Sequence, residues 1–158
     1  MSSTTAPVQA GTEAPDFTLP STSGETVTLS SFRGQKHVLL AFFPAAFSSV
    51  CTTEFCALSD DFDAFSSADV QVLPISVDNV PSLTEFRDKH AMRLELLSDF
   101  KREVATAYGV FLPSYLVANR AYFLIDQTGI VRWAHVEEHP GYKRENAEIL
   151  AAIGALSA

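Results

Sequence analysis

The feature that most constrains the fold is an uninterrupted apolar run, HVLLAFF, over residues 37–43, which Pro44 ends. A strand with one face in water alternates apolar and polar residues. A continuous run is instead typical of a strand that is covered on both faces, as in a parallel or mixed sheet. Residues 70–77 (VQVLPISV) form a second run of this kind. The chain therefore predicts an α/β protein with a buried sheet.

The segments around these runs supply the other elements. Apolar periodicity and turn signals predict short strands at 17–19 and 27–29 around a turn at 21–24, helices at 49–65, 82–92, 101–108 and 143–156, a short strand within 93–98, and a hairpin of 121–125 with 130–136. This order suits a thioredoxin-like fold, with a mixed central sheet flanked by helices and an N-terminal β extension. We expect a flexible tail over residues 1–10 and a single domain over residues 11–158.

Charge and composition exclude several classes of partner. The chain has 158 residues and a formal net charge of −8, which disfavours nucleic acid and anionic membranes as main partners. No stretch approaches the roughly 18 apolar residues of a membrane span, and the Ser/Thr/Ala-rich start is unlike a secretion signal. A Gly-rich nucleotide loop is also absent. We therefore expect a soluble cytoplasmic protein.

The chain has two cysteines, Cys51 and Cys56, and no histidine close to them in sequence. A zinc site needs further ligands, so catalytic or redox use is favoured over metal binding. A helix over residues 49–65 places Cys51 at the head of an apolar stripe and Cys56 on the opposite, polar side. The stripe continues through Phe55, Leu58, Phe62 and Phe65.

Both positions have chemical consequences. A thiol in the first turn of a helix is close to free backbone N–H groups and to the positive end of the helix dipole, which favour the nucleophilic thiolate. Five residues of helix separate the two Cα atoms by about 8 Å, whereas a disulfide needs converging Cα atoms within roughly 7 Å. A bond between Cys51 and Cys56 therefore requires local unwinding. On this geometry alone, a buried inert Cys51 is an equal alternative.

Residues 44–51 read PAAFSSVC, directly after the buried strand. This PxxxSxxC pattern resembles the peroxidatic signature of the peroxiredoxins, PxxxTxxC, with Ser in place of Thr. Further similar segments are GTEAPDFTL at 11–19, LSSFRG at 29–34, Ser98-Asp99 and NRAYFLIDQTGIVR at 119–132. The resemblance covers nearly the whole chain from Gly11 onward. It implies a thiol peroxidase that reduces hydrogen peroxide and organic hydroperoxides and needs no metal or other cofactor.

The resemblance also implies the roles of five residues. Cys51 matches the peroxidatic cysteine, and Ser48 the hydroxyl that bonds the thiolate and the peroxide. Pro44 matches the proline that shields the pocket, Arg120 the arginine that flanks the sulfur, and Glu54 a supporting carboxylate that holds such an arginine. Donors around the leaving oxygen stabilise its growing negative charge, and a nearby cation lowers the pKa of the thiol. Taken singly, these residues fit strand ends, helix caps or surface charges; only the joint pattern favours active-site roles.

Cys56, in its Cys-x4-Cys spacing, resembles the resolving cysteine of the bacterioferritin-comigratory, or Q-type, peroxiredoxins. The segments YGVF at 108–111 and VANRAYFLID at 117–126 are more similar to the E-type alkyl hydroperoxidases. The cysteine pair implies an intramolecular disulfide that an external dithiol reduces, such as thioredoxin or a glutaredoxin-like protein.

The assembly and two other functions stay open at this point. The resemblance suits a monomer or a homodimer, and a dimer would place the apolar loops near 44–47 and 111–115 at its interface. A thioredoxin-like disulfide oxidoreductase is one alternative, although it would favour Cys-x-x-Cys spacing. The other alternative is a redox-inert protein with the thioredoxin fold.

Overall fold

The computed structural model describes residues 7–47, 49–138 and 146–157, and the side chains of residues 49–51, 54, 146 and 157 fall outside this description. The elements are β1 (Thr18–Pro20), β2 (Thr26–Thr28), η1 (Leu29–Phe32), β3 (His37–Phe42), α1 (Ser49–Asp60), α2 (Phe62–Ser67), β4 (Val70–Ser76), α3 (Val80–Lys89), β5 (Leu97–Ser98), α4 (Glu103–Ala107), β6 (Phe111–Leu112), β7 (Val117–Ala118), β8 (Ala121–Ile125), β9 (Val131–Val136), α5 (Asn146–Gly154) and η2 (Ala155–Ser157).

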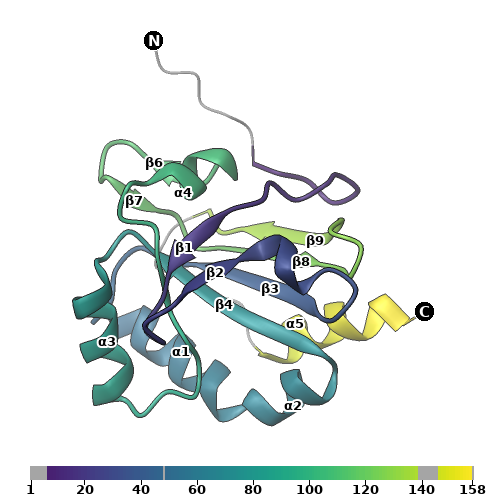
Figure 1. Cartoon of the computed structure of the whole chain (residues 1–158), viewed down its shortest axis with the longest axis horizontal. Helices are drawn as coiled ribbons and strands as arrows, with labels where there is room; N and C mark the ends of the chain where they lie inside the picture. Colours follow the sequence, from purple (N-terminus) through teal and green to yellow (C-terminus); the bar gives the residue numbers. More distant parts are fainter. Residues whose placement is uncertain (1–6, 48, 139–145, 158) are drawn as a thin grey trace.

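A five-stranded mixed sheet forms the centre of the molecule, in the order β5-β4-β3-β8-β9 (Figure 1). Strand β3, which the first apolar run predicts, lies in the middle, parallel to β4 and antiparallel to β8. Strands β1 and β2 form a separate hairpin, the expected N-terminal β extension. The thioredoxin-like α/β architecture predicted from the sequence is therefore confirmed.

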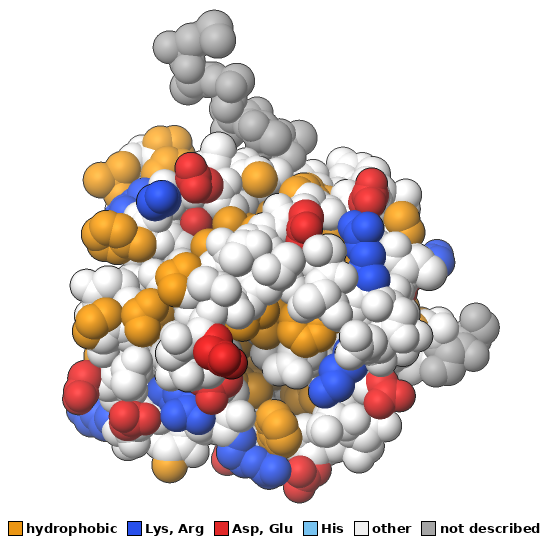
Figure 2. Space-filling model, in the orientation of Figure 1, with side chains coloured by type: hydrophobic (Ala, Val, Ile, Leu, Met, Phe, Trp, Pro, Cys, Tyr) orange, Lys and Arg blue, Asp and Glu red, His pale blue; other side chains and the backbone are white. Residues whose placement is uncertain are grey.

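A second hairpin, β6 with β7, carries much of the exposed apolar surface. Phe111 pairs with Ala118 and Leu112 with Val117. Phe100, Tyr115 and Leu116 are each more than half exposed, and Figure 2 shows hydrophobic side chains gathered over α4 and this hairpin. The sequence did not predict the hairpin, because two-residue strands are too short to show a period.

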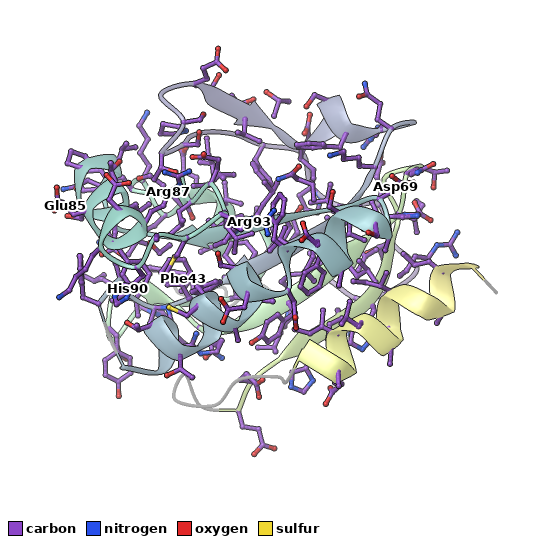
Figure 3. All side chains as sticks on the ribbon, turned by 90° about the horizontal axis from the view of Figure 1, so that it is seen from below. Phe43, Asp69, Glu85, Arg87, His90 and Arg93 are labelled. Atoms are coloured by element: carbon purple, nitrogen blue, oxygen red, sulfur yellow. The ribbon has the colours of Figure 1, made fainter. Side chains whose placement is uncertain are left out.

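The side chains of β3 enter two apolar clusters alternately. Leu40 and Phe42 face a cluster that includes the β1–β2 hairpin and α4, whereas Leu39 and Ala41 face a cluster supplied by α1, α2, α3 and α5. All four side chains are fully buried. Figure 3 looks onto the helical side and labels Asp69, just before β4, on the right and Phe43, just after β3, to the left of the centre. Cover on both faces explains why this run has no polar interruption.

Several predicted boundaries need correction. The helix predicted over 49–65 is two helices, α1 and α2, which are interrupted at Asp61. The helix predicted over 101–108 begins only at Glu103, because Arg102 has a left-handed backbone with φ 64°. The Asp99 carboxylate accepts the N–H groups of Val104 and Ala105 at 3.1 and 2.7 Å. Burial raises the pKa of Asp99, although these two bonds act to lower it.

Two other helices form close to their predicted positions. Helix α3 covers Val80–Lys89 instead of the predicted 82–92; Pro81 lies in its first turn, and Asn79 caps it by accepting the Ser82 N–H at 2.9 Å. Residues 143–145 of the predicted C-terminal helix lie outside the described residues; α5 covers Asn146–Gly154, and its Ile149 and Ile153 are buried. In the parts of the chain that the structure covers, no helix is long and apolar enough to cross a membrane.

Candidate active site

The loop that follows β3 leads directly to the cysteine-bearing helix. Residues 43–47, here called the β3–α1 loop, contain the half-buried Pro44, and α1 begins at Ser49. Cys51 is therefore the third helical residue, in the first turn, where backbone N–H groups have no partner within the helix. Ser48 lies outside the described residues, as do the side chains of Cys51 and Glu54.

Arg120 lies at the same edge of the sheet as this loop. It immediately precedes Ala121, which pairs with Phe42 at the end of β3. The Arg120 side chain is only 1% exposed and is the largest of the fully buried side chains described. A buried guanidinium is costly to desolvate, so it is found only where it pairs with an anion or donates hydrogen bonds to several acceptors. The topology thus brings Arg120 and Pro44, distant in sequence, to one edge.

The backbone around Arg120 is held by the neighbouring strand. Its carbonyl accepts the Glu137 N–H at 3.0 Å, and the Asn119 side-chain amide donates to the Glu137 carbonyl at 2.9 Å. Glu137 itself is only 3% exposed, with Oε1 3.2 Å from His135 Nε2. The sequence alone does not reveal Glu137, because its position opposite Arg120 follows from the register of β8 and β9.

Cys56 is a free cysteine in the middle of α1, and its environment corrects the sequence prediction. The helical wheel placed it on the polar side, but it is half-buried and packs against the apolar cluster of the helical face. Burial raises the pKa of the Cys56 thiol, and the negative charge of Asp60 raises it further. Phe55 and Leu58, predicted to face inward, are fully buried. In this state Cys56 is a protonated, weakly nucleophilic thiol at neutral pH.

Two residues, Asp78 and Phe47, hold the β3–α1 loop in place, and the sequence did not single out Asp78. Asp78, just after β4, accepts the Ala46 N–H with Oδ2 at 2.8 Å. Phe47 has a left-handed backbone with φ 68°, and its ring packs on that of Phe86 in α3, with centroids 5.1 Å apart. The only sequence signal for Asp78 is its position at the carboxyl end of a buried strand, where functional side chains often lie.

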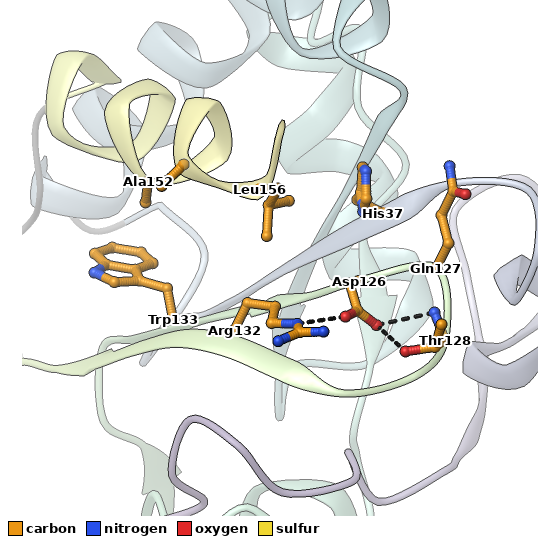
Figure 4. A pocket seen from close by; sticks show the side chains of 9 residues that line it. His37, Asp126, Gln127, Thr128, Arg132, Trp133, Ala152 and Leu156 are labelled. Atoms are coloured by element: carbon orange, nitrogen blue, oxygen red, sulfur yellow. Dashed lines mark hydrogen bonds and ion pairs between the residues drawn. The ribbon is translucent and has the colours of Figure 1, made fainter. Parts of the chain in front are cut away.

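A cavity of about 460 Å³ lies at the opposite end of the sheet (Figure 4). Its lining includes Trp133, His37 and Leu156, and an ion pair between Arg132 and Asp126. The Nδ1 atom of His37 is buried and has no hydrogen-bond partner among the described residues. The cavity is therefore separated from Cys51 by the length of the sheet.

The edge near Pro44 combines a cysteine in the first turn of a helix with a buried cation. Both features stabilise a thiolate. Across the described ranges, no group of three or more His, Cys, Asp or Glu side chains could hold a metal ion. The arrangement is suited to chemistry at sulfur.

The mixed sheet, its helical layer and the N-terminal hairpin define a thioredoxin-like α/β protein. The sequence model of the AhpC/TSA family matches residues 10–134, and the chain belongs to this family. It is 39% identical to Alkyl hydroperoxide reductase E of Mycobacterium tuberculosis over 150 residues, which cover 94% of this chain and 97% of the relative. It is also 39% identical to Peroxiredoxin Bcp of Escherichia coli over 129 residues, 78% of this chain and 82% of the relative.

Solved structures agree with this assignment. A reduced 2-Cys peroxiredoxin from Plasmodium vivax superposes with a TM-score of 0.88 and 33% identity, over 96% of this chain and 83% of that one. Peroxidoxin BcpB from M. tuberculosis gives a TM-score of 0.84 and 28% identity, over 94% of this chain and 98% of that one.

Proposed function

We propose that this protein is a thiol-dependent peroxidase in which Cys51 attacks the peroxide. The observation that carries the proposal is the fully buried Arg120 at the sheet edge where the helix of Cys51 begins. A cation in a low-dielectric site favours the thiolate and stabilises negative charge that develops on a departing oxygen. Membership of the AhpC/TSA family supports the same chemistry.

In the first step, the Cys51 thiolate attacks one oxygen of the O–O bond. An S–O bond forms, the O–O bond breaks, and the electron pair leaves on the other oxygen, which takes a proton to give water or an alcohol. Cys51 becomes a sulfenic acid. In this proposal Arg120, the Ser48 hydroxyl and first-turn N–H groups act on the leaving oxygen, Pro44 shields the sulfur, and Glu54 supports an arginine.

In the second step, Cys56 attacks the sulfur of the Cys51 sulfenic acid. A disulfide forms, and the hydroxyl group leaves with the Cys56 proton as water. Both residues belong to one continuous helix, α1, whose geometry keeps their Cα atoms about 8 Å apart. The raised pKa of Cys56 also makes it a weak nucleophile while the helix is folded. The first turns of α1 therefore unwind before the disulfide closes.

The cycle ends when an external dithiol, such as thioredoxin or a glutaredoxin-like protein, reduces the disulfide and is itself oxidised. Organic hydroperoxides are included among the substrates, since the name of one relative refers to alkyl hydroperoxides and Phe47 is half-exposed beside the site. A homodimer would cover the exposed apolar side chains of the β6–β7 hairpin, such as Tyr115.

Substitution of the two cysteines tests the proposal. We expect Cys51→Ser to abolish peroxide reduction. Cys56→Ser should react with the first equivalent of peroxide at the wild-type rate and then stop as the sulfenic acid. Intact-mass analysis after one equivalent should show the loss of two hydrogens in the wild type and a gain of one oxygen in Cys56→Ser. Full activity in Cys51→Ser would overturn the peroxidase assignment, whereas disulfide formation in Cys56→Ser would overturn only the resolving step.

A further inference from the structure

One carboxylate oxygen links the β3–α1 loop to the end of β4. Oδ2 of Asp78 accepts the Ala46 N–H at 2.8 Å and the Ser76 hydroxyl at 2.8 Å. The Asp78 backbone is itself fixed, because its N–H donates to Ser76 Oγ at 3.2 Å and its carbonyl accepts the Ser98 hydroxyl at 2.6 Å. Asp78 is thus rigidly held by β4 and β5 and extends its carboxylate to the loop.

The loop that Asp78 holds is conformationally strained. Phe47, the residue after Ala46, has a φ of 68°, a region that non-glycine residues rarely occupy. Phe47 is 49% exposed, and its ring packs on the Phe86 ring and lies below the Lys89 ammonium group, 5.8 Å from the ring centroid. Strained backbone persists only where surrounding contacts fix it. Loss of the bond between Ala46 and Asp78 therefore favours a change in the conformation of the loop.

We propose that Asp78 is a positioning residue that sets the balance between the two steps of the cysteine cycle. With the Ala46 bond made, the loop fixes the start of α1 for attack on the peroxide. The start of α1 must unwind for Cys51 and Cys56 to meet, and loss of this bond makes that unwinding easier. The inference rests on the proposed peroxidase function and adds a residue that controls the relative rates of peroxide attack and disulfide closure.

This role has a kinetic signature that a purely structural role lacks. Loss of the anchor slows the first step, because Cys51 is less well positioned, and accelerates the second, because less structure has to unwind. The Ala46 N–H and the Ser76 hydroxyl both donate to Oδ2 of Asp78, and the side-chain oxygen of an asparagine can accept both bonds. The variant Asp78→Asn should therefore behave like the wild type, whereas Asp78→Ala should not.

Stopped-flow and quenched-flow mass analysis of the full chain with hydrogen peroxide tests the proposal. For Asp78→Ala we expect sulfenic acid formation about tenfold slower and disulfide closure about tenfold faster, as for loss of a hydrogen bond to a charged group. Asp78→Asn should restore both rates to within about twofold. The matched control is Asn79→Ala, at the adjacent residue. It removes the side chain that caps α3 but leaves the bond between Asp78 and the loop in place, so both rates should be unchanged.

The outcomes separate two kinds of failure. If Asp78→Ala slows both steps, changes neither, or matches Asn79→Ala, the positioning role is wrong while the peroxidase function stands. If the wild type itself forms neither sulfenic acid nor disulfide, the proposed function fails. Thermal unfolding of each variant shows whether it is folded. If Asp78→Ala does not fold, Ala46→Pro removes the same N–H donor from the loop side and should give the same opposed changes.

Discussion

The two ends of the central sheet each carry an aspartate and an arginine. At the end where β3 and β4 finish, Asp78 accepts an N–H group from the β3–α1 loop, and Arg120 is buried at the start of β8. At the other end, Asp126 and Arg132 pair with each other across the β8–β9 turn, and the Arg132 side chain is 55% exposed. The residue types are the same, but their contacts differ.

Asp126 uses its acceptors within its own turn. Its Oδ1 accepts the Thr128 N–H, the Thr128 hydroxyl and the Ile130 N–H at 2.9, 2.6 and 3.1 Å. Burial acts to raise the pKa of Asp126, but these bonds and the bond from Arg132 lower it to about 2. Asp126 is therefore a fixed structural anion. Asp78 and Arg120, in contrast, lie where a loop and a helix from elsewhere in the chain converge.

This difference shows why cavity size does not locate the reacting end. The cavity of about 460 Å³ lies beside Asp126 and Arg132, whose charges already neutralise each other (Figure 4). The end with Cys51 is marked instead by a buried cation and a strained loop residue, Phe47. Strain and buried charge are expensive, and they cluster where function requires them.

The largest effect should come from comparing the two arginines. We expect Arg120→Met to slow sulfenic acid formation by about 10²–10³-fold, the usual cost of removing one donor to a developing oxyanion. Arg120→Lys should fall between this variant and the wild type, since it keeps the charge without the planar fork. Arg132→Met, at the other end, should stay within about twofold of the wild type. Stopped-flow measurement with hydrogen peroxide gives all of these rates.

Circular dichroism and thermal unfolding must accompany these rates, because Arg120 is buried. A folded Arg120→Met that reacts within about threefold of the wild type would remove Arg120 from the chemistry. A loss of comparable size in Arg132→Met would show that the two ends are not functionally distinct.

The next effect is on stability at the end with the cavity. We expect Asp126→Ala to lower the free energy of unfolding by about 2 kcal/mol, because it leaves three donors of the turn without their acceptor. Peroxide reduction at pH 7 should not change. Urea denaturation measures the stability. The matched control is Asp88→Ala, which removes an exposed carboxylate paired with Arg87 at 3.5 Å and should cost no more than about 0.5 kcal/mol. Equal losses in both variants would contradict the assigned role of Asp126.

Much of the fold was predictable, because full burial leaves a mark in the sequence. The runs that became β3 and β4 have no polar alternation, and their residues are covered on both faces. The β6–β7 hairpin left no such mark. The break at Asp61 was also missed, because α1 and α2 share one apolar period, in which Leu58 and Phe65 are both buried.

The site was predictable only where residues near in sequence act together. The motif over residues 44–51 marks the helix start, and the resemblance adds Arg120, but only the register of β3 with β8 brings the two to one edge. A helical wheel describes one helix alone, so it did not reveal that Cys56 packs against the surrounding cluster. Asp78 was missed for the same reason, since its partner Ala46 lies on a different segment.

The smallest effect concerns the pH dependence of the same carboxylate, Asp126. Its pKa is about 2 in the folded state and about 3.9 in an unfolded chain. A lowered pKa stabilises the fold above pH 4, and this contribution is lost as the pH falls from about 4 to about 2. We expect the difference in unfolding free energy between the wild type and Asp126→Asn to shrink by about 1 kcal/mol over this range, after allowance for partial exposure. Urea titrations of both proteins at pH 5 and pH 2 measure it, and comparison with Asp126→Asn cancels the titration of the other carboxylates. A difference that is constant or grows toward low pH would show that the Asp126 charge does not stabilise the turn, and the contrast between the two ends of the sheet would then rest on Arg120 alone.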